Sequence, residues 1–549
     1  MAKEININSI PKEKLALANR GDRIMDQKFD DKPIGYFRDA WNRFRKNKAS
    51  IVAAIIICLI VVFALVTPIF DTGTGTSFDT YYAKKTPRNL FLSNFGIATG
   101  DVEKDFNERQ YINEIAKGLA ASEGFGSNNE LALSEVLEMD NPLQPITKFD
   151  RVEATQQGKK VNNIYYASID EYVAVGFIYK QVSQDEYKNM VAWQENTGIQ
   201  LLYPLLDTDQ NKLCTTDANW WYKTDNKGNP QRTNKSGKHV KIKFDTIDEI
   251  VLEDNYLRYE YDGSDNVGSY KEGELQYRRY KGGGSSVETA ELEVRVLYYN
   301  YYRYIHSSDR VSDPGHEPEF LFGTDVSGYD LAQRIAMGLR LSLLFAVSIF
   351  AINFIIGAIY GSIEGYYGGS ADLIMEFVVY ILSGIPFIVV STLFQIHLAA
   401  KAGPIPSLLF AFVLTGWIGT AGLVRTQFYR FKNQEYVMAA RTLGARDTRI
   451  IWKHIFPNTL GTIITSSVLA IPGVIFSESM LTYLGIVNLN SKTSTSLGTV
   501  LAQAEGTWTE KPHVMLFPAL FLSLLMISFN LFGNGLRDAF NPSLRGVEE

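Results

Sequence analysis

Apolar residues gather along this chain in six blocks that are separated by polar sequence. The first block, 49–70, contains no charged residue and follows a short run of five arginines and lysines. About 20 consecutive apolar residues suffice for a helix to cross a bilayer, and an excess of Lys and Arg marks the cytoplasmic side. The chain is therefore expected to start inside. Five further blocks predict spans at 341–363, 373–398, 405–427, 460–485 and 514–534.

Six spans place both ends of the chain in the cytoplasm. Residues 1–48 form the N-terminal segment, 341–534 the five-helix core and 535–549 a tail that carries Arg537 and Arg545. A cleaved signal peptide is the alternative for the first block, 49–70. The block is long, begins nearly fifty residues into the chain and lacks a small-x-small cleavage site, which favours a span.

The polar stretch 71–319 faces outside in this topology and is acidic, with 28 Lys or Arg against 40 Asp or Glu. Alternating apolar and polar residues predict strands, whereas a 3.6-residue spacing predicts helices. The fold class is thus a mainly α membrane protein with an inserted extracellular α+β domain and an antiparallel sheet. Strands are predicted at 172–182, 238–244 and 291–304, helices at 129–139 and 184–202, further strands and turns within 256–286, and long loops at 205–238.

Composition narrows the function further. The net charge of −6 argues against a nucleic-acid role, and the two cysteines, Cys58 in a span and Cys214 outside, cannot pair. The six histidines lack metal-ligand spacing, so no metal site is predicted. The chain also lacks the Gly-x4-Gly-Lys-Ser/Thr loop that cradles phosphates. Any ATP must then be hydrolysed by another polypeptide.

The cytoplasmic loop 428–459 says most about function. The surrounding stretch 425–458 holds seven Lys or Arg against two acidic residues. In its predicted helix, Ala439, Ala440 and Gly444 leave the backbone open to close approach by a soluble partner. A basic helix lying on lipid is the alternative. That helix would present large apolar side chains where this one has small residues, and the glycine interrupts it after two to three turns.

This loop resembles the coupling loop of ABC importer permeases, with the pattern Glu-Ala-Ala-x3-Gly-x9-Ile-x-Leu-Pro. Met438 stands in place of the first Glu, with Glu435 one turn earlier, and the ending His-Ile-Phe-Pro-Asn is similar to that of the peptide and nickel branch. The resemblance implies a helix that couples the pore to an ATPase through residues Glu435, Met438, Ala439, Ala440, Arg441, Gly444, His454 and Pro457.

The segment 320–340, before the second span, has apolar residues at helical spacing beside two arginines, which predicts an amphipathic helix in the membrane interface. Its Phe-Gly-Thr-Asp run is similar to the same family's peptide branch, as are 364–372, 477–485 and 530–545. At Glu376 and Val379 that branch more often has Arg and Asp. The interfacial candidates are Gly323, Thr324, Asp325, Asp330, Arg334 and Arg340.

Within the spans, Glu478 is the most informative polar residue, with a bend expected near Pro472 and Gly473. Glu478 either lines the translocation path or a gate, or is a carboxyl buried against a neighbouring helix. The second interpretation is favoured, because the family has Glu here in transporters of unlike substrates.

Together the motifs resemble the C-type permease subunit of a binding-protein-dependent importer, oligopeptide/dipeptide branch, of type I permease fold. The resemblance implies half of a pore, a second, B-type permease subunit, two ATP-binding subunits that hold ATP and Mg, and an extracellular peptide-binding lipoprotein. This chain would bind no cofactor and would lie in the plasma membrane of a single-membrane bacterium, with residues 71–340 extracellular. A membrane receptor, a secondary transporter and an importer of a nickel complex are the alternatives.

Overall fold

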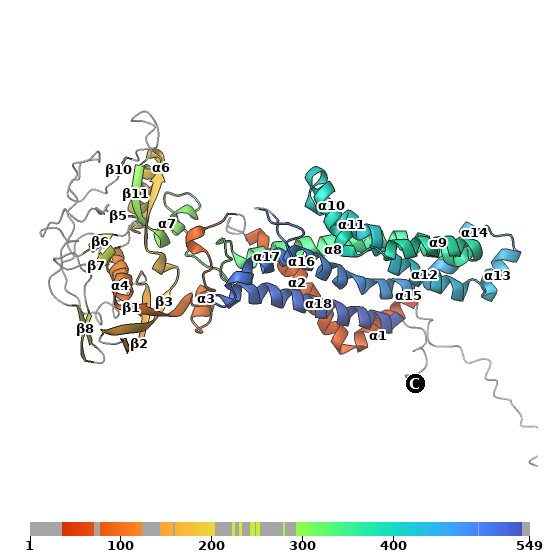
Figure 1. The fold of residues 1–549 in the computed structure, drawn as a ribbon, viewed down its shortest axis with the longest axis horizontal. Helices are drawn as coiled ribbons and strands as arrows, with labels where there is room; N and C mark the ends of the chain where they lie inside the picture. Colours follow the sequence, from red (N-terminus) through yellow and green to blue (C-terminus); the bar gives the residue numbers. More distant parts are fainter. Residues whose placement is uncertain are drawn as a thin grey trace, which may run out of the picture.

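A computed structural model gives the fold. Helices dominate both ends of the sequence, and strands occur only between the first and second long helices of the described chain (Figure 1). The structure describes residues 36–70, 77–122, 143–157, 160–203, 222–224, 230–232, 242–246, 249–252, 278–279, 292–491 and 494–540.

Long apolar helices form an elongated bundle. Within the described residues, five helical stretches are long and apolar enough to cross a membrane, and a bent pair makes a sixth if it counts as one span. Many outward side chains are large and apolar, which suits helices that meet lipid tails. The helices are α1 (Tyr36–Lys46), α2 (Lys48–Val66), η3 (Thr67–Phe70), α8 (Leu331–Tyr367), α9 (Gly369–Ser383), α10 (Phe387–Ala402), α11 (Pro404–Gly416), α12 (Ile418–Phe431), α13 (Glu435–Thr442), α14 (Asp447–Arg449), the π-helical turn η6 (Ile450–Ile455), α15 (Phe456–Val468), α16 (Ala470–Tyr483), α17 (Leu497–Ala504), η7 (Glu505–Thr507) and α18 (Pro512–Phe540).

The predicted span 373–398 is a broken helix. Its two parts, α9 and α10, meet at an angle of 73°. Pro386 lies at the break, and proline has no backbone N–H and crowds the preceding turn. The apolar block therefore turns midway, which its hydropathy does not reveal.

The predicted interfacial helix in 320–340 is also different in the structure. The residues from Leu331 onward begin α8, which continues without a break to Tyr367. Nearly every side chain in its first three turns is buried, including Arg334 and Leu339. A helix lying in the interface would keep one face in the headgroups. This stretch is instead the tightly packed first part of the long helix α8.

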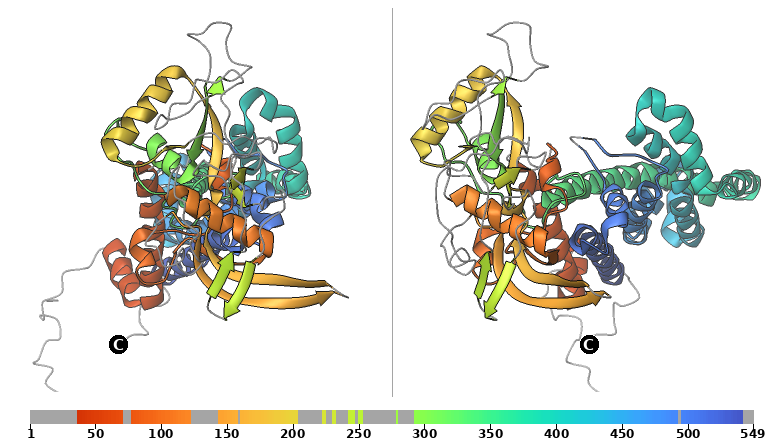
Figure 2. Two further views of the ribbon diagram at one scale, coloured as in Figure 1. Left: turned by 90° about the vertical axis from the view of Figure 1, so that its left-hand side faces the viewer. Right: turned by 60° about the vertical axis from the view of Figure 1, so that its left-hand side comes forward.

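The insert is an α+β unit, and its described strands pair antiparallel, as the sequence predicts. One sheet has the order β1-β3-β2, and a second has β10-β11-β4 with β5 also paired to β11 (Figure 2). The elements are η4 (Thr80–Tyr82), α3 (Leu90–Ser93), β1 (Asp101–Asn107), α4 (Glu108–Ser122), β2 (Ile146–Gln157), β3 (Lys160–Asp170), η5 (Val173–Val175), β4 (Phe177–Val182), α6 (Gln184–Thr197), β5 (Leu202–Tyr203), β6 (Tyr222–Thr224), β7 (Pro230–Arg232), β8 (Ile242–Thr246), β9 (Glu249–Leu252), β10 (Arg278–Arg279), β11 (Leu292–Leu297) and α7 (Tyr298–Ile305).

Some of the helices and strands predicted for the insert agree with the structure, and others do not. The helix predicted at 184–202 is confirmed over α6 but ends at Thr197. The strand predicted at 172–182 is confirmed over β4, whereas its first part is the 3-10 turn η5. The strand predicted at 291–304 is wrong beyond Leu297, where α7 begins. Tyr298 and Tyr302, one helical turn apart, both pack their rings on Tyr82, at centroid distances of 5.0 and 5.2 Å. This shared contact needs helical spacing. The helix at 129–139 and most of 205–238 and 256–286 lie outside the described residues.

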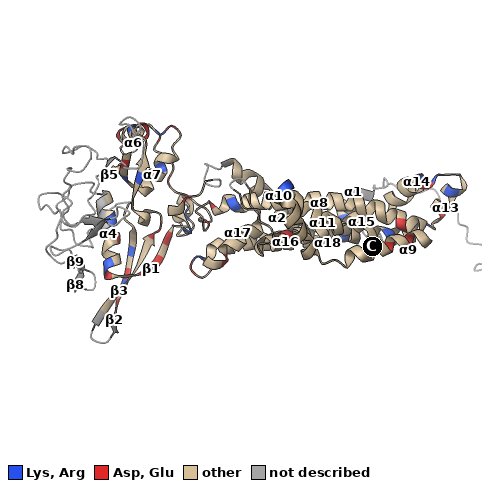
Figure 3. Ribbon diagram, turned by 45° about the horizontal axis from the view of Figure 1, so that its top comes forward, with Lys and Arg blue, Asp and Glu red and all other residues tan. Residues whose placement is uncertain are grey.

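The insert and the segment around α13 lie at opposite ends of the bundle (Figure 1). Charged residues gather at these two ends, whereas the middle of the bundle is mostly uncharged (Figure 3). The chain enters and leaves the insert at neighbouring points, because the N–H of Arg88 donates to Phe320 O at 2.9 Å and the N–H of Phe320 donates to Arg88 O at 2.8 Å.

Candidate functional site: an exposed helix and its anchors

Helix α13 has the local structure that its sequence predicts. Alanines favour helix, and a glycine in the left-handed conformation is a common helix end. Gly444 has φ +79°, and its N–H donates to Arg441 O at 3.0 Å. The helix thus ends within about two turns, where the glycine was expected to stop it.

One face of α13 is uncovered. Val437 is fully buried beneath it, whereas Met438 and the following Leu443 are 54% and 88% exposed. Glu435 and Ala439 are exposed, and Ala440 is half-buried. Exposed apolar side chains that lie together mark interaction sites more often than ordinary surface. The chemistry of this face, small and apolar residues with charges around them, suits a protein partner.

The exposed segment is anchored to the end of α8. The hydroxyl of Tyr366 donates to Asp447 Oδ1 at 2.6 Å and accepts from Arg441 Nη2 at 3.4 Å. On the same helix, Gly365 O accepts from Lys432 Nζ at 2.9 Å. A push on α13 would therefore reach α8 through side-chain contacts.

A second route leads into α15. The π-helical turn η6 contains His454, and Pro457 follows in the first turn of α15, where proline costs no hydrogen bond. Ile450 and Ile455 of this turn are buried in the same apolar cluster as Val437. Wide π turns are rare and often occur at functional positions.

Arg425 of α12 is the centre of an ion-pair cluster near this end. Its Nε lies 2.6 Å from Asp372 Oδ1 and 3.4 Å from Glu364 Oε1, and its Nη1 lies 3.4 Å from Glu376 Oε2. Glu376 departs from the residue that the family more often has at this position, and the family pattern does not predict the cluster. The close spacing of Glu364, Asp372 and Glu376 around the turn between α8 and α9 is the feature of the sequence that could have indicated a basic partner. The cluster ties α8, α9 and α12 together.

Glu478, the gate candidate, is packed between helices. It is 1% exposed, and its Oε2 accepts from Ser342 Oγ of α8 at 2.8 Å. The helix is interrupted at Leu469, between α15 and α16. Pro472 lacks the N–H that would bond to Val468 O, so one backbone hydrogen bond is missing at this interruption. Pro472 is buried and Gly473 exposed.

The outer candidates fix chain segments rather than form an open site. Asp330 caps α8 by accepting from the N–H of Ala332 at 2.8 Å. Arg340 donates to Ala64 O at 3.3 Å. Gly323, Thr324 and Asp325 are buried. The hydroxyl of Thr324 donates to Tyr82 O, and Asp325 accepts from the N–H of Tyr329 at 2.9 Å. Arg334 donates to Asn490 Oδ1, and also to Ser491 O at 3.2 Å.

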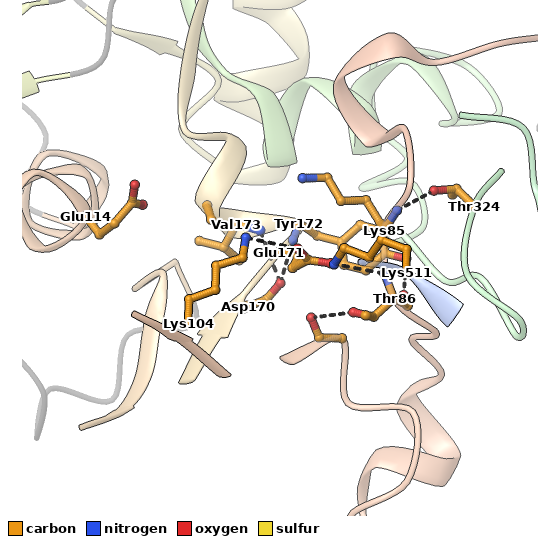
Figure 4. A network of polar contacts seen from close by, with 12 residues as sticks. Lys85, Thr86, Lys104, Glu114, Asp170, Glu171, Tyr172, Val173, Thr324 and Lys511 are labelled. Atoms are coloured by element: carbon orange, nitrogen blue, oxygen red, sulfur yellow. Dashed lines mark hydrogen bonds and ion pairs between the residues drawn. The ribbon is translucent and has the colours of Figure 1, made fainter. Parts of the chain in front are cut away.

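The insert is joined to the bundle by a buried carboxylate (Figure 4). Glu171 accepts from Lys511 Nζ, just before α18, at 2.6 Å and from Lys104 Nζ at 3.1 Å. Burial alone would raise the pKa of Glu171, but the hydrogen bond and charge of Lys511, with the other lysines, hold it below its usual value. Burial lowers the pKa of nearby Lys85 to about 8. No pattern in the sequence predicts this contact between Glu171 and Lys511, which are 340 positions apart.

Comparisons with known proteins extend these observations. The family model described as "binding-protein-dependent transport system inner membrane component" matches residues 353–546, and that of the N-terminal TM domain of oligopeptide transport permease C matches 35–87. The dipeptide transport system permease protein DppC of Bacillus subtilis (strain 168) is 40% identical over 41% of this chain and 69% of that protein.

The oligopeptide transport system permease protein OppC of the same organism is 37% identical over 44% of this chain and 79% of that protein. Among solved structures, the MetNI methionine ABC transporter in an inward-facing conformation overlaps 38% of this chain and 96% of that chain, with a TM-score of 0.33 and 16% identity.

Proposed function

The chain belongs to the C-type permease subunits of binding-protein-dependent oligopeptide and dipeptide transport systems, and from this premise we propose that it forms half of the translocation pore of an ATP-driven oligopeptide importer. A second, B-type permease subunit completes the pore. Two ATP-binding subunits hold ATP and Mg and hydrolyse it. An extracellular binding lipoprotein delivers the peptide.

The exposed face of α13 carries this proposal. It lies at the end of the bundle remote from the insert (Figure 1). Leu443, directly after α13, is an apolar residue that is almost fully exposed in the chain alone. A partner that covers this face removes apolar surface from water, at about 25 cal/mol per Å². An ATPase subunit on the cytoplasmic side is the partner that the coupling motif implies.

Transport follows from moving this helix. When the ATPases close on ATP, they draw the two coupling helices of the pore together. The bonds of Tyr366 to Asp447 and Arg441 transmit the displacement to α8, and η6 transmits it to α15. The bundle then rocks between inward-open and outward-open arrangements, a rigid-body change of a kind common in switching proteins.

This orientation fixes the location of each part. The chain crosses the plasma membrane of a single-membrane bacterium several times, and both termini lie in the cytoplasm, on the same side of the membrane as α13. Residues 71–340, with the insert, lie outside, on the side from which the lipoprotein delivers peptide.

Glutamate placed on the coupling face tests the proposal. Ala439→Glu and Ala440→Glu put a charge where a close-fitting partner excludes water, so peptide uptake is expected to fall by tenfold or more, since uncompensated burial of a charge costs several kcal/mol. Membrane insertion is unchanged. The measurement is uptake of a radiolabelled tripeptide into proteoliposomes that contain the complete transporter, together with ATP hydrolysis.

Ala371→Glu is the matched control, because Ala371 is an exposed alanine of α9 outside the coupling helix. It should transport as the wild type does. Normal uptake by Ala440→Glu would remove α13 from the coupling role.

A further inference from the structure

A cavity of about 510 Å³ lies where the insert meets the segments that lead into the bundle. Its wall is formed by the turn that begins at Ser77, strand β4, helix α7 and the segment that follows α7, from His306 to Gly328. Cavities that bind small molecules measure about 300–1,000 Å³ and combine apolar walls with a few polar groups. This cavity has that character, because its lining includes Tyr81, Tyr298, Tyr301, Lys180, Arg310 and Asp79.

Lys180 is the unusual group in the lining. It lies in the middle of β4, and its Nζ is 5.1 Å from the ring centroid of Tyr301 and 5.5 Å from that of Tyr81. No carboxylate among the described residues forms an ion pair with it. Burial lowers the pKa of Lys180, and only the charge of Asp79 opposes that effect. The ammonium group of Lys180 therefore lies beside two aromatic rings and forms no ion pair with a carboxylate of the described residues.

A charge of the opposite sign and a second cation share the cavity. Asp79 is fixed in place, because its Oδ1 accepts from the N–H of Tyr81 at 3.0 Å. Arg310 is held only weakly: its Nη1 lies 3.5 Å from Glu186 Oε1, and its side chain is half-exposed. Two cations, one carboxylate and several tyrosine rings match a ligand that carries a carboxylate, an amine and an apolar side chain.

We propose that this cavity binds a short zwitterionic peptide, with its terminal carboxylate on Lys180, its amine toward Asp79 and an aromatic side chain against the tyrosines. The choice of a peptide rests on the proposed function. The site gives the insert a role of its own: it holds peptide at the outer end of the pore, separately from the binding lipoprotein and from the path between the spans.

The test uses the whole transporter in lipid nanodiscs without the binding lipoprotein. The probe is radiolabelled Ala-Phe-Ala, and its competitor is the same tripeptide with an amidated C-terminus. The wild type should bind the free acid saturably and at least about tenfold more tightly than the amide, which lacks the charge-assisted hydrogen bond. In Lys180→Met the two should bind equally weakly, and Lys180→Arg should restore the preference.

Lys188→Met is the matched control, because Lys188 is an exposed lysine of α6 that pairs only with Asp185 among the described residues. It should bind as the wild type does. Equal binding of acid and amide by the wild type, or an unchanged preference in Lys180→Met, overturns the proposal. Peptide uptake by the wild type with the lipoprotein present is measured in parallel. Absence of uptake would contradict the importer function. Normal uptake together with equal binding of acid and amide would contradict this site alone.

Discussion

At the scale of single residues, two charged groups hold the molecule together at its two ends. Arg425 forms ion pairs with acidic residues near α13, and Glu171 forms ion pairs with lysines where the insert meets the bundle. Burying a charge is costly unless it is paired, and removing one partner leaves the other uncompensated. Both clusters join segments far apart in the sequence, so each acts as a clamp between elements that would otherwise separate.

The Glu171 clamp has a predictable pH dependence. A carboxyl whose folded pKa lies below its unfolded value stabilises the protein above the unfolded pKa, about 4.3, and that contribution is lost as the pH falls through the folded pKa. Glu171→Gln should therefore lower the midpoint of thermal unfolding at pH 7, and the difference from the wild type should shrink as the pH falls below about 4.

Thermal unfolding of the purified chain in detergent, at several pH values, measures this difference. Glu153→Gln is the control, because Glu153 forms an exposed pair with Arg151. An exposed pair contributes about 1 kcal/mol or less, so the control should change little. A difference for Glu171→Gln that stays constant from pH 7 to acid would contradict the clamp.

At the scale of elements, glycines let α8 and α12 approach closely. Gly357, Gly361 and Gly365 recur every four residues on one face of α8. A Cβ on Gly361 would collide with the backbone of Ala421, and one on Gly365 with Phe428. Such small-xxx-small faces are typical of packed membrane helices. The four-residue spacing of these glycines is visible in the sequence, but only the structure shows that α12 packs against them.

Gly361→Leu should push α8 and α12 apart. Overpacking of this kind typically costs about 1–3 kcal/mol, and backbone lies directly against this position, so the upper end is expected. The measurement is thermal stability by size-exclusion chromatography of the solubilised chain. Gly473→Leu is the control, since nothing lies within 4 Å of a Cβ placed there. Equal stability of the two variants would contradict the close packing.

At the scale of the whole molecule, the insert is an excursion from a continuous permease chain. The mutual hydrogen bonds of Arg88 and Phe320 bring its two ends together. The matched family regions end at residue 87 and resume at 353. The pairing lies within a few residues of the end of the segment 71–319 that the sequence predicts as the insert, and Tyr82, before Arg88, still packs in the core of the insert. Adjacent ends are what allow a domain to be inserted without disturbing its host.

Replacing residues 90–318 with a four-residue Gly-Ser linker should leave the bundle intact, because paired antiparallel residues lie about 5 Å apart and a short loop can close them. The shortened chain should insert in the membrane and co-purify with the ATPase subunits. The same linker in place of 434–443 is the comparison variant: it should insert but lose the ATPases. Loss of the ATPases from the first variant would show that the insert supports assembly.

The sequence by itself determined the features that arise locally. A run of apolar residues is a span because lipid cannot satisfy its backbone unless it is helical. Ala439, Ala440 and Gly444 make a short helix through their own propensities, and alternating residues in the insert make antiparallel strands. The strand predicted over Tyr298–Ile305 is wrong, because tyrosines favour strands locally but here pack on the ring of Tyr82 at helical spacing.

Only the tertiary structure decided what depends on distant partners. The angle between α9 and α10, the burial of Arg334, the clusters around Arg425 and Glu171 and the cavity beside Lys180 each need residues that the chain brings together from far apart. Ion pairs and close helix contacts act over a few ångströms in space and leave no period in the sequence. The approximate places of the long apolar helices therefore followed from the sequence, whereas the bend between α9 and α10 and the contacts between distant segments came from the fold.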